Sequence, residues 1–459
     1  MPEHYDAIII GAGQAGPPLA ERLGRAGYRT AIIERHLLGG TCVNVGCIPT
    51  KTLVGSARIA WAARQAAEFG VVIDGPVGVD MQRVKARKDE VAGASNAGVT
   101  NWIDGMKNVT LIRGHARFTG PRALSVNDQA LTADRVFIDV GARARVPDFP
   151  GIDSVDYLTN SSMMDVDFLP EHLLIVGGSY IGLEFAQIYR RFGAEVTVVE
   201  MQDRLIARED ADVSDAVREI LEGEGVNIRL KAECLAFEPG PKGVRMNIDC
   251  AIDSTPLDGS HVLLAVGRVP NTHDLGLDLA GIETNERGFI NVDDELRTSA
   301  EGVWALGEVN GQGAFTHTSY NDFEIVAANL LDEDERLVSD RIPCYGLFID
   351  PPLGRVGMTE TQVRASGRRA LIGTRPMSRV GRAREFGDTR GFMKILVDAD
   401  TEEILGASLL GLSGDEAVHA LLDVMYAGMP YTVISRAVHI HPTVTELIPT
   451  VLQGLTPLE

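Results

Sequence analysis

The chain has 459 residues, of which 45% are hydrophobic, and a formal net charge of −21. A single hydrophobic core stops growing near roughly 250–300 residues, so two to four domains are expected. The acidity argues against nucleic acid or anionic membrane as a partner, because binding phosphates needs a basic surface. No apolar run approaches the ~18 residues of a membrane helix, and no leader-like segment precedes Tyr5, so we expect a cytoplasmic globular protein.

The first predicted strand, Tyr5 to Ile10, runs directly into a glycine-rich turn. Gly11, Gly13 and Gly16 have the spacing of a dinucleotide-binding turn, which needs a tight bend, close approach of backbone to pyrophosphate, and close helix packing. Glu34 ends the next apolar strand and is expected to accept hydrogen bonds from ribose hydroxyls. The alternative is a glycine turn in an ordinary α/β unit.

A cysteine pair follows, within the segment from Gly39 to Lys51. Cys42 and Cys47 are five residues apart, which in an ideal helix separates their Cα atoms by about 8.7 Å. A disulfide tolerates only ~7 Å, so a bridged pair requires a distorted turn, which Gly46 permits. Pro49 is tolerated near a helix start, where N–H dipoles lower a cysteine pKa. The segment therefore predicts reactive thiolate chemistry.

The cysteine pair has two other interpretations. A zinc site would need a second pair of ligands, and Cys234, Cys250 and Cys344 stand alone without adjacent histidines. Two inert buried cysteines are the second alternative. Five cysteines in so long a chain are too few for a secreted disulfide scaffold, so any disulfide is expected to be catalytic.

The strand–turn–helix pattern appears a second time, where the strand Leu173–Val176 precedes Gly177, Ser179 and Gly182. Glu200 follows Gly177 at the same interval that separates Glu34 from Gly11, so the two copies are in register. Ser179 stands at the middle glycine position, which predicts looser binding of pyrophosphate in this copy.

The difference between the copies suggests which cofactor each one binds. A tightly held FAD fits the first copy, and a dissociating nicotinamide dinucleotide fits the second. Glu200 favours NADH over NADPH, because a carboxylate repels a 2′-phosphate and accepts from a free 2′-hydroxyl. Arg204 would soften that preference, so NADPH is the alternative.

From Arg341 the pattern changes to that of an α+β domain, with strands at 391–397 and 404–410 and helices at 415–426 and 430–438. His441 follows and is our candidate acid–base group, because histidine titrates in the range that thiol exchange needs. Glu446 is expected to orient its imidazole. His439 is interpreted as a structural neighbour, and a metal site built on both histidines lacks a third ligand.

The segment from Gly39 to Lys51 resembles the redox-active segment of the class I pyridine nucleotide-disulfide oxidoreductases, the family of dihydrolipoamide dehydrogenase, glutathione reductase and mercuric reductase. The resemblance covers essentially the whole chain. It includes Val266–Asn271, similar to the turn that closes the nucleotide domain, and Thr298–Glu308, similar to the second flavin motif. That motif usually ends in aspartate, whereas this chain has Glu308, one methylene longer.

The resemblance implies that Cys42 attacks substrate, while Cys47 lies by the flavin and forms the charge-transfer thiolate. It also implies that Lys51 lies near flavin N5 with Glu184 as its ion-pair partner, and that Tyr180 covers the nicotinamide pocket. The cofactor-binding residues implied in all are Gly11, Gly13, Gly16, Glu34, Gly40, Thr41, Gly141, Gly177, Ser179, Tyr180, Gly182, Glu200, Gly267, Arg268, Gly307 and Glu308.

The expected fold is α/β, with two Rossmann-like doubly wound nucleotide-binding domains and a C-terminal α+β dimerisation domain. The expected boundaries are 1–147 and 268–338 for a discontinuous FAD domain, 148–267 for the NAD(P) domain and 339–459 for the dimerisation domain. The resemblance implies a homodimer in which His441 reaches the cysteines of the other subunit.

The expected function is an FAD-dependent NAD(P)H:disulfide oxidoreductase acting on a small disulfide, a lipoyl group or a metal ion. Mercury is disfavoured, because the chain ends Thr456–Glu459 without a terminal cysteine pair and carries a histidine that mercuric reductases lack. Thioredoxin-type substrates are disfavoured for want of a further terminal redox cysteine. The alternatives are a copper or mercury ion reductase of oxidant or metal defence, and a flavin redox sensor or complex subunit without turnover. A transhydrogenase of similar architecture would not need the two cysteines, so their presence argues against that function.

Overall fold

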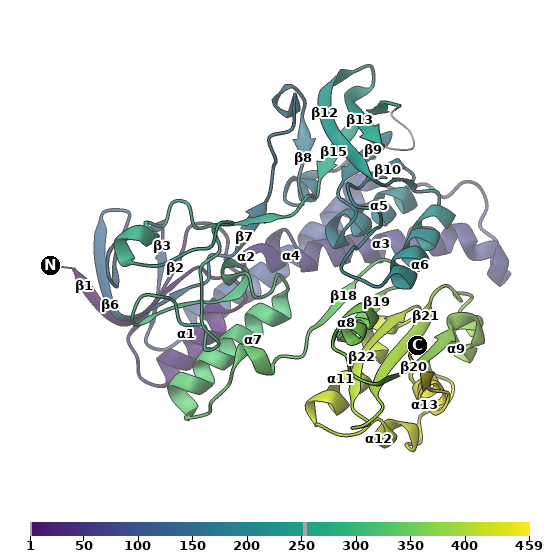
Figure 1. The fold of residues 1–459 in the computed structure, drawn as a ribbon. Coiled ribbons are helices and arrows are strands. Elements are labelled where there is room, and N and C mark those ends of the chain that lie inside the picture. Colours follow the sequence, from purple (N-terminus) through teal and green to yellow (C-terminus); the bar gives the residue numbers. More distant parts are fainter. Residues whose placement is uncertain (1, 251–254) are drawn as a thin grey trace.

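Three α/β units, each built on its own main sheet, make up the computed structural model, which describes residues 2–250 and 255–459 apart from the side chains of Cys234, Asp249 and Cys250 (Figure 1). The predicted combination of two Rossmann-like units and a C-terminal α+β unit is confirmed, and the sheet of the last unit is antiparallel. Among the described residues, no helix is both long and apolar enough to cross a bilayer.

The first unit is built around β1, whose residues from Ala7 to Ile10 are buried as in parallel strands covered on both faces. β1 pairs in parallel with β2 and β6, so Ile10 lies level with Ile33 and Ile138 at the carboxyl edge. The sheet order is β3-β2-β1-β6-β5-β4, with β17 beside β6. The strands are β1 (Glu3–Ile10), β2 (Thr30–Glu34), β3 (Val109–Arg113), β4 (Ala116–Gly120), β5 (Ala123–Val126), β6 (Gln129–Ile138) and β17 (Val303–Ala305).

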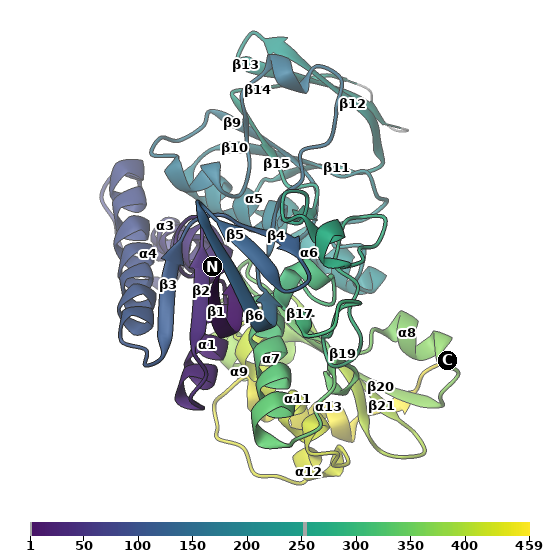
Figure 2. The same cartoon turned by 90° about the vertical axis from the view of Figure 1, so that its left-hand side faces the viewer.

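Helices begin at the carboxyl ends of these strands, and Figure 2 shows the sheet with α1 and α4 beside it. α1 starts at Gly16, and prolines occupy its first positions, where they leave no hydrogen bond unmade. The hairpin β4–β5 stands where a doubly wound sheet would carry a crossover helix, so this sheet is mixed. The helices are α1 (Gly16–Arg25), α2 (Gly40–Asn44), α3 (Cys47–Gln65), α4 (Met81–Asp104) and α7 (Thr316–Ala327).

The second unit repeats the arrangement with an all-parallel sheet in the order β11-β10-β9-β15-β8. Every residue of β9 is buried, which explains its continuous apolar sequence. An antiparallel sheet of β12, β13 and β14 and the short pair β7–β16 complete the connections. The elements are β7 (Ala142–Ala144), β8 (Tyr157–Leu158), β9 (His172–Val176), α5 (Tyr180–Phe192), β10 (Glu195–Val199), α6 (Ala211–Gly223), β11 (Asn227–Arg229), β12 (Ala232–Gly240), β13 (Gly243–Cys250), β14 (Leu257–Gly259), β15 (His261–Leu264) and β16 (Arg268–Pro270).

The third unit is a six-stranded antiparallel sheet in the order β18-β19-β22-β21-β20-β23. The helix expected at 415–426 is split into α10 and α11, and the one expected at 430–438 is limited to α12. The elements are β18 (Cys344–Leu347), β19 (Leu353–Gly357), α8 (Glu360–Ala365), β20 (Ala370–Pro376), α9 (Gly381–Glu385), β21 (Phe392–Asp398), β22 (Ile404–Leu410), α10 (Gly414–Ala417), α11 (His419–Tyr426), α12 (Thr432–Ser435), α13 (Ile448–Gln453) and β23 (Thr456–Pro457).

Candidate active site

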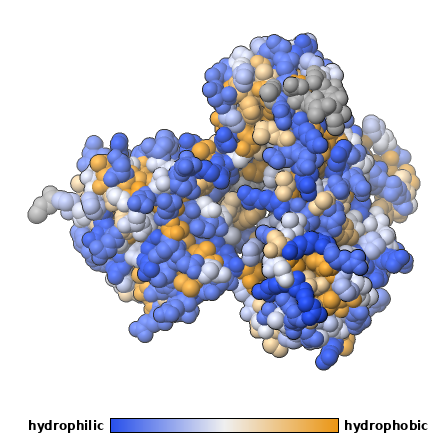
Figure 3. Space-filling view, in the orientation of Figure 1, coloured by the Kyte–Doolittle hydropathy of each residue, from blue (hydrophilic) through white to orange (hydrophobic). Residues whose placement is uncertain are grey.

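A cavity of about 1900 Å³ lies where the three units meet, and Figure 3 shows the surface hollowed there. Pockets for single small molecules usually measure roughly 300–1,000 Å³, so this one has room for more than one ligand. Most of the predicted site residues line it, namely Gly11, Gly13, Glu34, Gly40, Thr41, Cys42, Cys47, Lys51, Gly141, Ser179, Tyr180, Glu184, Gly267, Arg268 and Glu308.

The first glycine turn leaves no space for side chains. Gly11 has a φ of +106°, and a Cβ added there would lie 2.2 Å from the carbonyl oxygen of Asp139. A Cβ on Gly16 would lie 2.5 Å from the carbonyl oxygen of Gly11, and one on Gly40 would lie 3.0 Å from the Cα of Gly13. Only glycine therefore fits at these positions, and the backbone of Gly11, Gly13 and Gly40 lines the cavity, where a pyrophosphate could approach it closely.

Two carboxylates hold this turn. Glu34 accepts from the backbone N–H groups of Ala12 (2.9 Å) and His36 (2.7 Å), which leaves lone pairs for ribose hydroxyls. Asp139, which sequence reasoning missed, directly follows β6 and accepts from the N–H of Gly16 at 2.8 Å. Burial raises the pKa of Asp139 well above its usual value. Its position after the buried strand Val136–Ile138 was the available signal.

The second glycine turn has the same construction. A Cβ on Gly177 would lie 2.4 Å from the carbonyl oxygen of Ala265, and one on Gly182 would lie 2.0 Å from the carbonyl oxygen of Gly177. Glu200 accepts from the N–H groups of Gly178 (2.6 Å) and Gln202 (2.8 Å), as Glu34 does in the first copy. Both turns and both acids thus match the requirements of a dinucleotide site.

The cysteine segment breaks between two helices, so the predicted distorted turn is confirmed. α2 ends at Asn44 and α3 begins at Cys47. A Cβ on Gly46 would lie 2.8 Å from the carbonyl oxygen of Thr41, which is why glycine occupies this position. Cys42 and Cys47 are both free thiols in the structure.

The pKa values of the two thiols are shifted in opposite directions. Hydrogen bonding from Cys42, together with the Thr316 hydroxyl and the charge of Lys51, lowers the pKa of Cys47 to about 6 against the opposing effect of burial. The same contact, with burial, raises the pKa of Cys42. At neutral pH Cys47 is therefore the thiolate and Cys42 the thiol.

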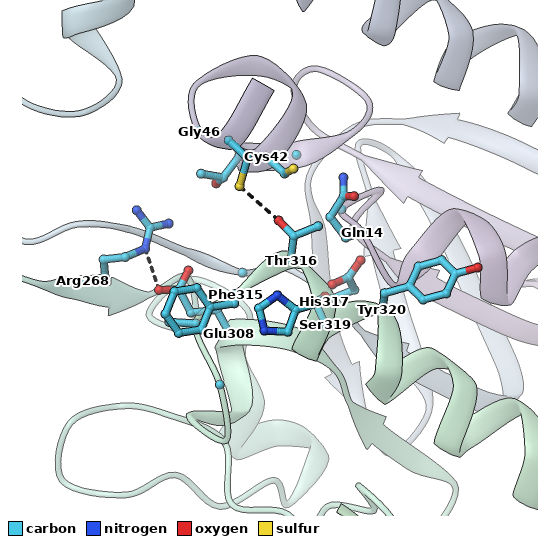
Figure 4. Close-up of a pocket in the computed structure, with 18 of the residues that line it drawn as sticks. Gln14, Cys42, Gly46, Arg268, Glu308, Phe315, Thr316, His317, Ser319 and Tyr320 are labelled. Carbon is cyan, nitrogen blue, oxygen red and sulfur yellow. Dashed lines mark hydrogen bonds and ion pairs between the residues drawn. The ribbon is translucent and has the colours of Figure 1, made fainter. Parts of the chain in front are cut away.

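Thr316, at the first position of α7, was missed by the sequence analysis. Its Oγ1 lies 3.3 Å from Sγ of Cys47, and Figure 4 shows the threonine pointing from α7 toward the cysteine segment. Nothing in the sequence around residue 316 signals this contact, because it joins helices 269 residues apart. Phe315 and His317, its neighbours, also line the cavity.

Lys51 and Glu184 come together across two units. Lys51 Nζ on α3 lies 2.7 Å from Glu184 Oε2 on α5, and the carboxylate is 6% exposed. The other oxygen of Glu184 accepts from the N–H of Phe348, whose ring lies under the ammonium at 4.7 Å. The ammonium is thereby fixed on the cavity wall.

Glu308 is paired with another predicted residue. Its Oε1 accepts from Arg268 Nε at 2.6 Å, and both side chains are largely buried (Figure 4). Arg268 also donates to the carbonyl oxygen of Ala142. Glu308, which is one methylene longer than the aspartate usual in the family, thus has one carboxylate oxygen fixed by Arg268. Gly307 before it has a φ of +73°, and a Cβ there would lie 2.7 Å from Ser319 Oγ.

His441 and Glu446 form their own pair outside the cavity. His441 Nδ1 lies 2.9 Å from Glu446 Oε2, and the imidazole is 79% exposed within this chain. Neither residue lines the cavity. His439 is half-buried, and its Nδ1 lies 3.3 Å from the carbonyl oxygen of Ala437. Within the described part of the chain, no group of three or more histidine, cysteine, aspartate or glutamate side chains is arranged to hold a metal ion.

Comparisons with known proteins agree with this geometry. Residues 5–322 match the model of the pyridine nucleotide-disulphide oxidoreductase family, and residues 344–452 match the dimerisation domain of that family. A probable pyridine nucleotide-disulfide oxidoreductase RclA of Escherichia coli is 38% identical over 452 residues, covering 96% of this chain and 97% of that one. A dihydrolipoyl dehydrogenase of Thermus scotoductus is 32% identical over 445 residues, covering 96% and 95%.

A solved structure is similar over nearly the whole chain. It is the Cu(II) complex of the HOCl-induced flavoprotein disulfide reductase RclA from Escherichia coli, with a TM-score of 0.89 at 37% identity, covering 98% of this chain and 99% of that one. The family implies FAD and NAD(P)H as cofactors and enzymatic activity, and the matched C-terminal domain indicates a homodimer. The chain belongs to the pyridine nucleotide-disulphide oxidoreductase family of NAD(P)H-dependent flavoprotein enzymes.

Proposed function

We propose that the protein is an NADH-dependent disulfide reductase whose working thiols are Cys42 and Cys47. The main observation in support is that both thiols line the same cavity as the first glycine turn, with the pKa of Cys47 lowered and that of Cys42 raised. A thiolate and a neighbouring thiol are the groups that thiol–disulfide exchange requires.

The residues around the first glycine turn are proposed to hold FAD. Gly11, Gly13 and Gly16 take its pyrophosphate at the start of α1, and Glu34 takes a ribose. The glycine backbone that lines the cavity and the spare lone pairs of Glu34 fit the group. When bound, the flavin accepts a hydride from the nicotinamide and returns the electron pair to the cysteine disulfide.

Each cysteine then carries out one step of the thiol–disulfide exchange. In the dithiol form, Cys42, once deprotonated, attacks one sulfur of the substrate disulfide, releases the first thiol and forms a mixed disulfide. The Cys47 thiolate attacks Sγ of Cys42, which closes the Cys42–Cys47 disulfide and releases the second substrate sulfur as a thiolate that takes its proton from solvent. Thr316 and Lys51 stabilise the Cys47 thiolate that the last step needs.

His441 is proposed to carry the protons from the second subunit. It takes one proton from Cys42 and returns it to the leaving thiolate, while Glu446 fixes its tautomer. Two facts support a shared site, namely the exposure of His441 in its own chain and its absence from the cavity that holds the cysteines. The homodimer would then be the catalytic unit, in the cytoplasm.

NADH is the proposed electron donor. Glu200 presents a carboxylate at the end of β10, where a 2′-phosphate would meet repulsion. Arg204, the cation that would soften this preference, pairs with Asp203 at 3.2 Å. The second glycine turn and Tyr180 at the start of α5 are proposed to receive the nicotinamide dinucleotide.

Metal-ion reduction is a second candidate. A similar solved structure is described as a Cu(II) complex, and a thiolate pair is a ligand set that soft metal ions prefer. In this alternative the ion is a substrate that accepts electrons at Cys42 and Cys47. A redox sensor without turnover is the candidate of another class, and it would consume NADH only once per flavin.

The experiment measures NADH oxidation by the FAD-loaded enzyme with lipoamide, glutathione disulfide, an aromatic disulfide, Cu(II) or Hg(II). We expect a disulfide to sustain many turnovers, with Cys42→Ser and Cys47→Ser each losing that activity. Cys344→Ser is the matched control, because this free cysteine lines the same cavity without a proposed role. Faster oxidation with metal ions than with any disulfide would favour the second candidate, and stoichiometric oxidation alone would favour the sensor.

A further inference from the structure

Tyr180 is surrounded by aromatic rings from the other two units. Its ring meets those of Phe315 and Tyr345 edge-on, with centroids 5.9 and 5.5 Å away. Phe315 and Tyr345 are themselves stacked at 5.5 Å and 13°. Phe315 precedes α7 of the first unit and Tyr345 lies on β18 of the third. The ring of Tyr180 is thus confined by two fixed rings, an arrangement that aromatic pairs favour.

Tyr345 is in turn hydrogen-bonded to a buried ion pair. Its hydroxyl donates to Glu209 Oε1 at 2.5 Å. Glu209 and Arg355 have side chains 0% and 1% exposed, with Arg355 Nε 3.7 Å from Glu209 Oε2. Arg355 lies opposite Tyr345 across β18 and β19, and its Nη1 donates to the carbonyl oxygen of Ala407 and to Ser408 Oγ on β22. The hydroxyl of Tyr345 is therefore held by Glu209, which precedes α6 of the second unit and is itself paired with Arg355 of the third.

Three of these side chains also have polar atoms beside the cavity that make no hydrogen bond. The hydroxyl of Tyr180, Oε2 of Glu209 and Nη2 of Arg355 are buried without a hydrogen-bond partner. Unpartnered buried polar atoms are unfavourable, so their retention calls for a role. Tyr180, Tyr345 and Arg355 all line the cavity. Burial raises the pKa of Tyr180 to about 12, so its hydroxyl stays protonated at neutral pH.

We propose that Tyr345, fixed by Glu209 and Arg355, is a positioning residue that holds Tyr180 and thereby sets how tightly the nicotinamide dinucleotide binds. The inference rests on the proposed function, which assigns the start of α5 to that dinucleotide. Because a pre-organised wall loses less freedom when a ligand binds, loosening Tyr180 weakens binding. The third unit would then contribute to the dinucleotide site of its own subunit.

The experiment uses Tyr345→Leu, which removes the ring, and Tyr345→Phe, which keeps the ring and removes the hydroxyl. Tyr426→Phe is the matched control, because it removes one hydroxyl hydrogen bond in the same unit away from the cavity. Each Tyr345 variant is also made in a Tyr180→Ala background. NAD⁺ binding to the oxidised FAD-loaded enzyme is measured by calorimetry, and flavin reduction is followed at increasing NADH by anaerobic stopped flow.

We expect the Kd for NAD⁺ and the Kd for NADH in flavin reduction to rise at least fivefold in Tyr345→Leu and at least twofold in Tyr345→Phe. Neither change should have a further effect in the Tyr180→Ala background, and reoxidation of dithionite-reduced enzyme by disulfide should be unchanged. Kd values within 1.5-fold of wild type, or an equal effect without Tyr180, would overturn the proposal. If Tyr345→Leu does not fold, Tyr345→Phe decides alone. Failure of NADH to reduce the wild-type flavin would instead overturn the proposed function.

Discussion

At the scale of single residues, the acidity of Cys47 depends on three neighbours that come from different parts of the chain. Cys42 is on α2, Thr316 begins α7 and Lys51 lies one turn further along α3. Each of them favours the thiolate, and together they outweigh burial. The reactivity of the pair is therefore a property of where α2, α3 and α7 meet.

The pH dependence of the Cys47 thiolate follows from this. The pKa of Cys47 is lowered to about 6, so the thiolate of the dithiol enzyme is present above that pH and lost as pH falls through it. We expect the long-wavelength absorption of reduced enzyme to titrate near pH 6. Thr316→Val should move the midpoint upward, because a hydrogen bond that lowers the pKa is removed.

Thr450→Val is the control for that titration. Thr450 is exposed on α13 and does not line the cavity, so the midpoint should not move. An unchanged midpoint in Thr316→Val would show that the hydroxyl does not stabilise the thiolate.

At the scale of elements, the break between α2 and α3 places both thiols on one cavity. Gly46→Ala would put a Cβ 2.8 Å from the carbonyl oxygen of Thr41 and 3.2 Å from the Cα of Cys42, so the backbone must shift. Displacing reacting groups by about 1 Å costs on the order of 10²-fold in rate. We expect a loss of that size in disulfide turnover, measured with NADH.

Gly55→Ala provides the comparison on the same helix. Gly55 lies inside α3 with no atom within 4 Å of an added Cβ. Alanine there should stabilise the helix by about 0.5–1 kcal/mol and leave turnover unchanged. Equal activity of the two alanine variants would contradict the role given to the break.

The sequence predicted those features of the elements that depend on neighbours along the chain. The two glycine turns, their acids and the distorted cysteine turn follow from local backbone geometry, and the structure has them where expected. Thr316, Tyr345 and Arg355 could not be found this way, because their partners are brought close only by tertiary packing. Glu308 and Arg268 were both singled out, yet their pairing was not.

At the scale of the whole molecule, buried ion pairs join the second and third units. Arg191 on α5 is 1% exposed and bonds Glu224 at 2.7 Å and Asp350 at 2.6 Å. Arg390 shares Glu224. Lys394 forms a second such cluster with Asp210 and others. These contacts fix one wall of the cavity relative to another. The exact residue limits of the three domains stay predictions.

Removing Arg191 tests that junction. Arg191→Met would leave Glu224 without the partner that satisfies both of its oxygens, and breaking a buried pair costs about 3–5 kcal/mol. We expect a loss of that order in the free energy of unfolding from urea denaturation. Arg218→Ala, which removes an exposed pair with Glu222, should cost about 0.3–0.5 kcal/mol. Similar losses in both variants would mean that the buried cluster stabilises the protein no more than an exposed pair does.

The shared active site makes a prediction about mixed dimers. Cys42→Ser and His441→Gln homodimers should both be inactive, because each site lacks one essential group. If sites combine residues of two subunits, random mixing should restore about a quarter of wild-type activity, since half of the dimers carry one intact site of two. Disulfide turnover is measured after unfolding and refolding the mixture. No recovery would show that His441 serves its own subunit or neither.

Anaerobic titration of the FAD-loaded protein with NADH would show whether NADH electrons reach the Cys42–Cys47 pair. We expect a long-wavelength absorption band after two electrons, from the Cys47 thiolate beside oxidised flavin. Cys42→Ser cannot form the disulfide, so its band should be present before NADH is added and be lost when two electrons reduce the flavin. Cys47→Ser should show no such band at any stage. Bleaching of the wild-type flavin without such a band would contradict the account and leave the cysteines outside the electron path.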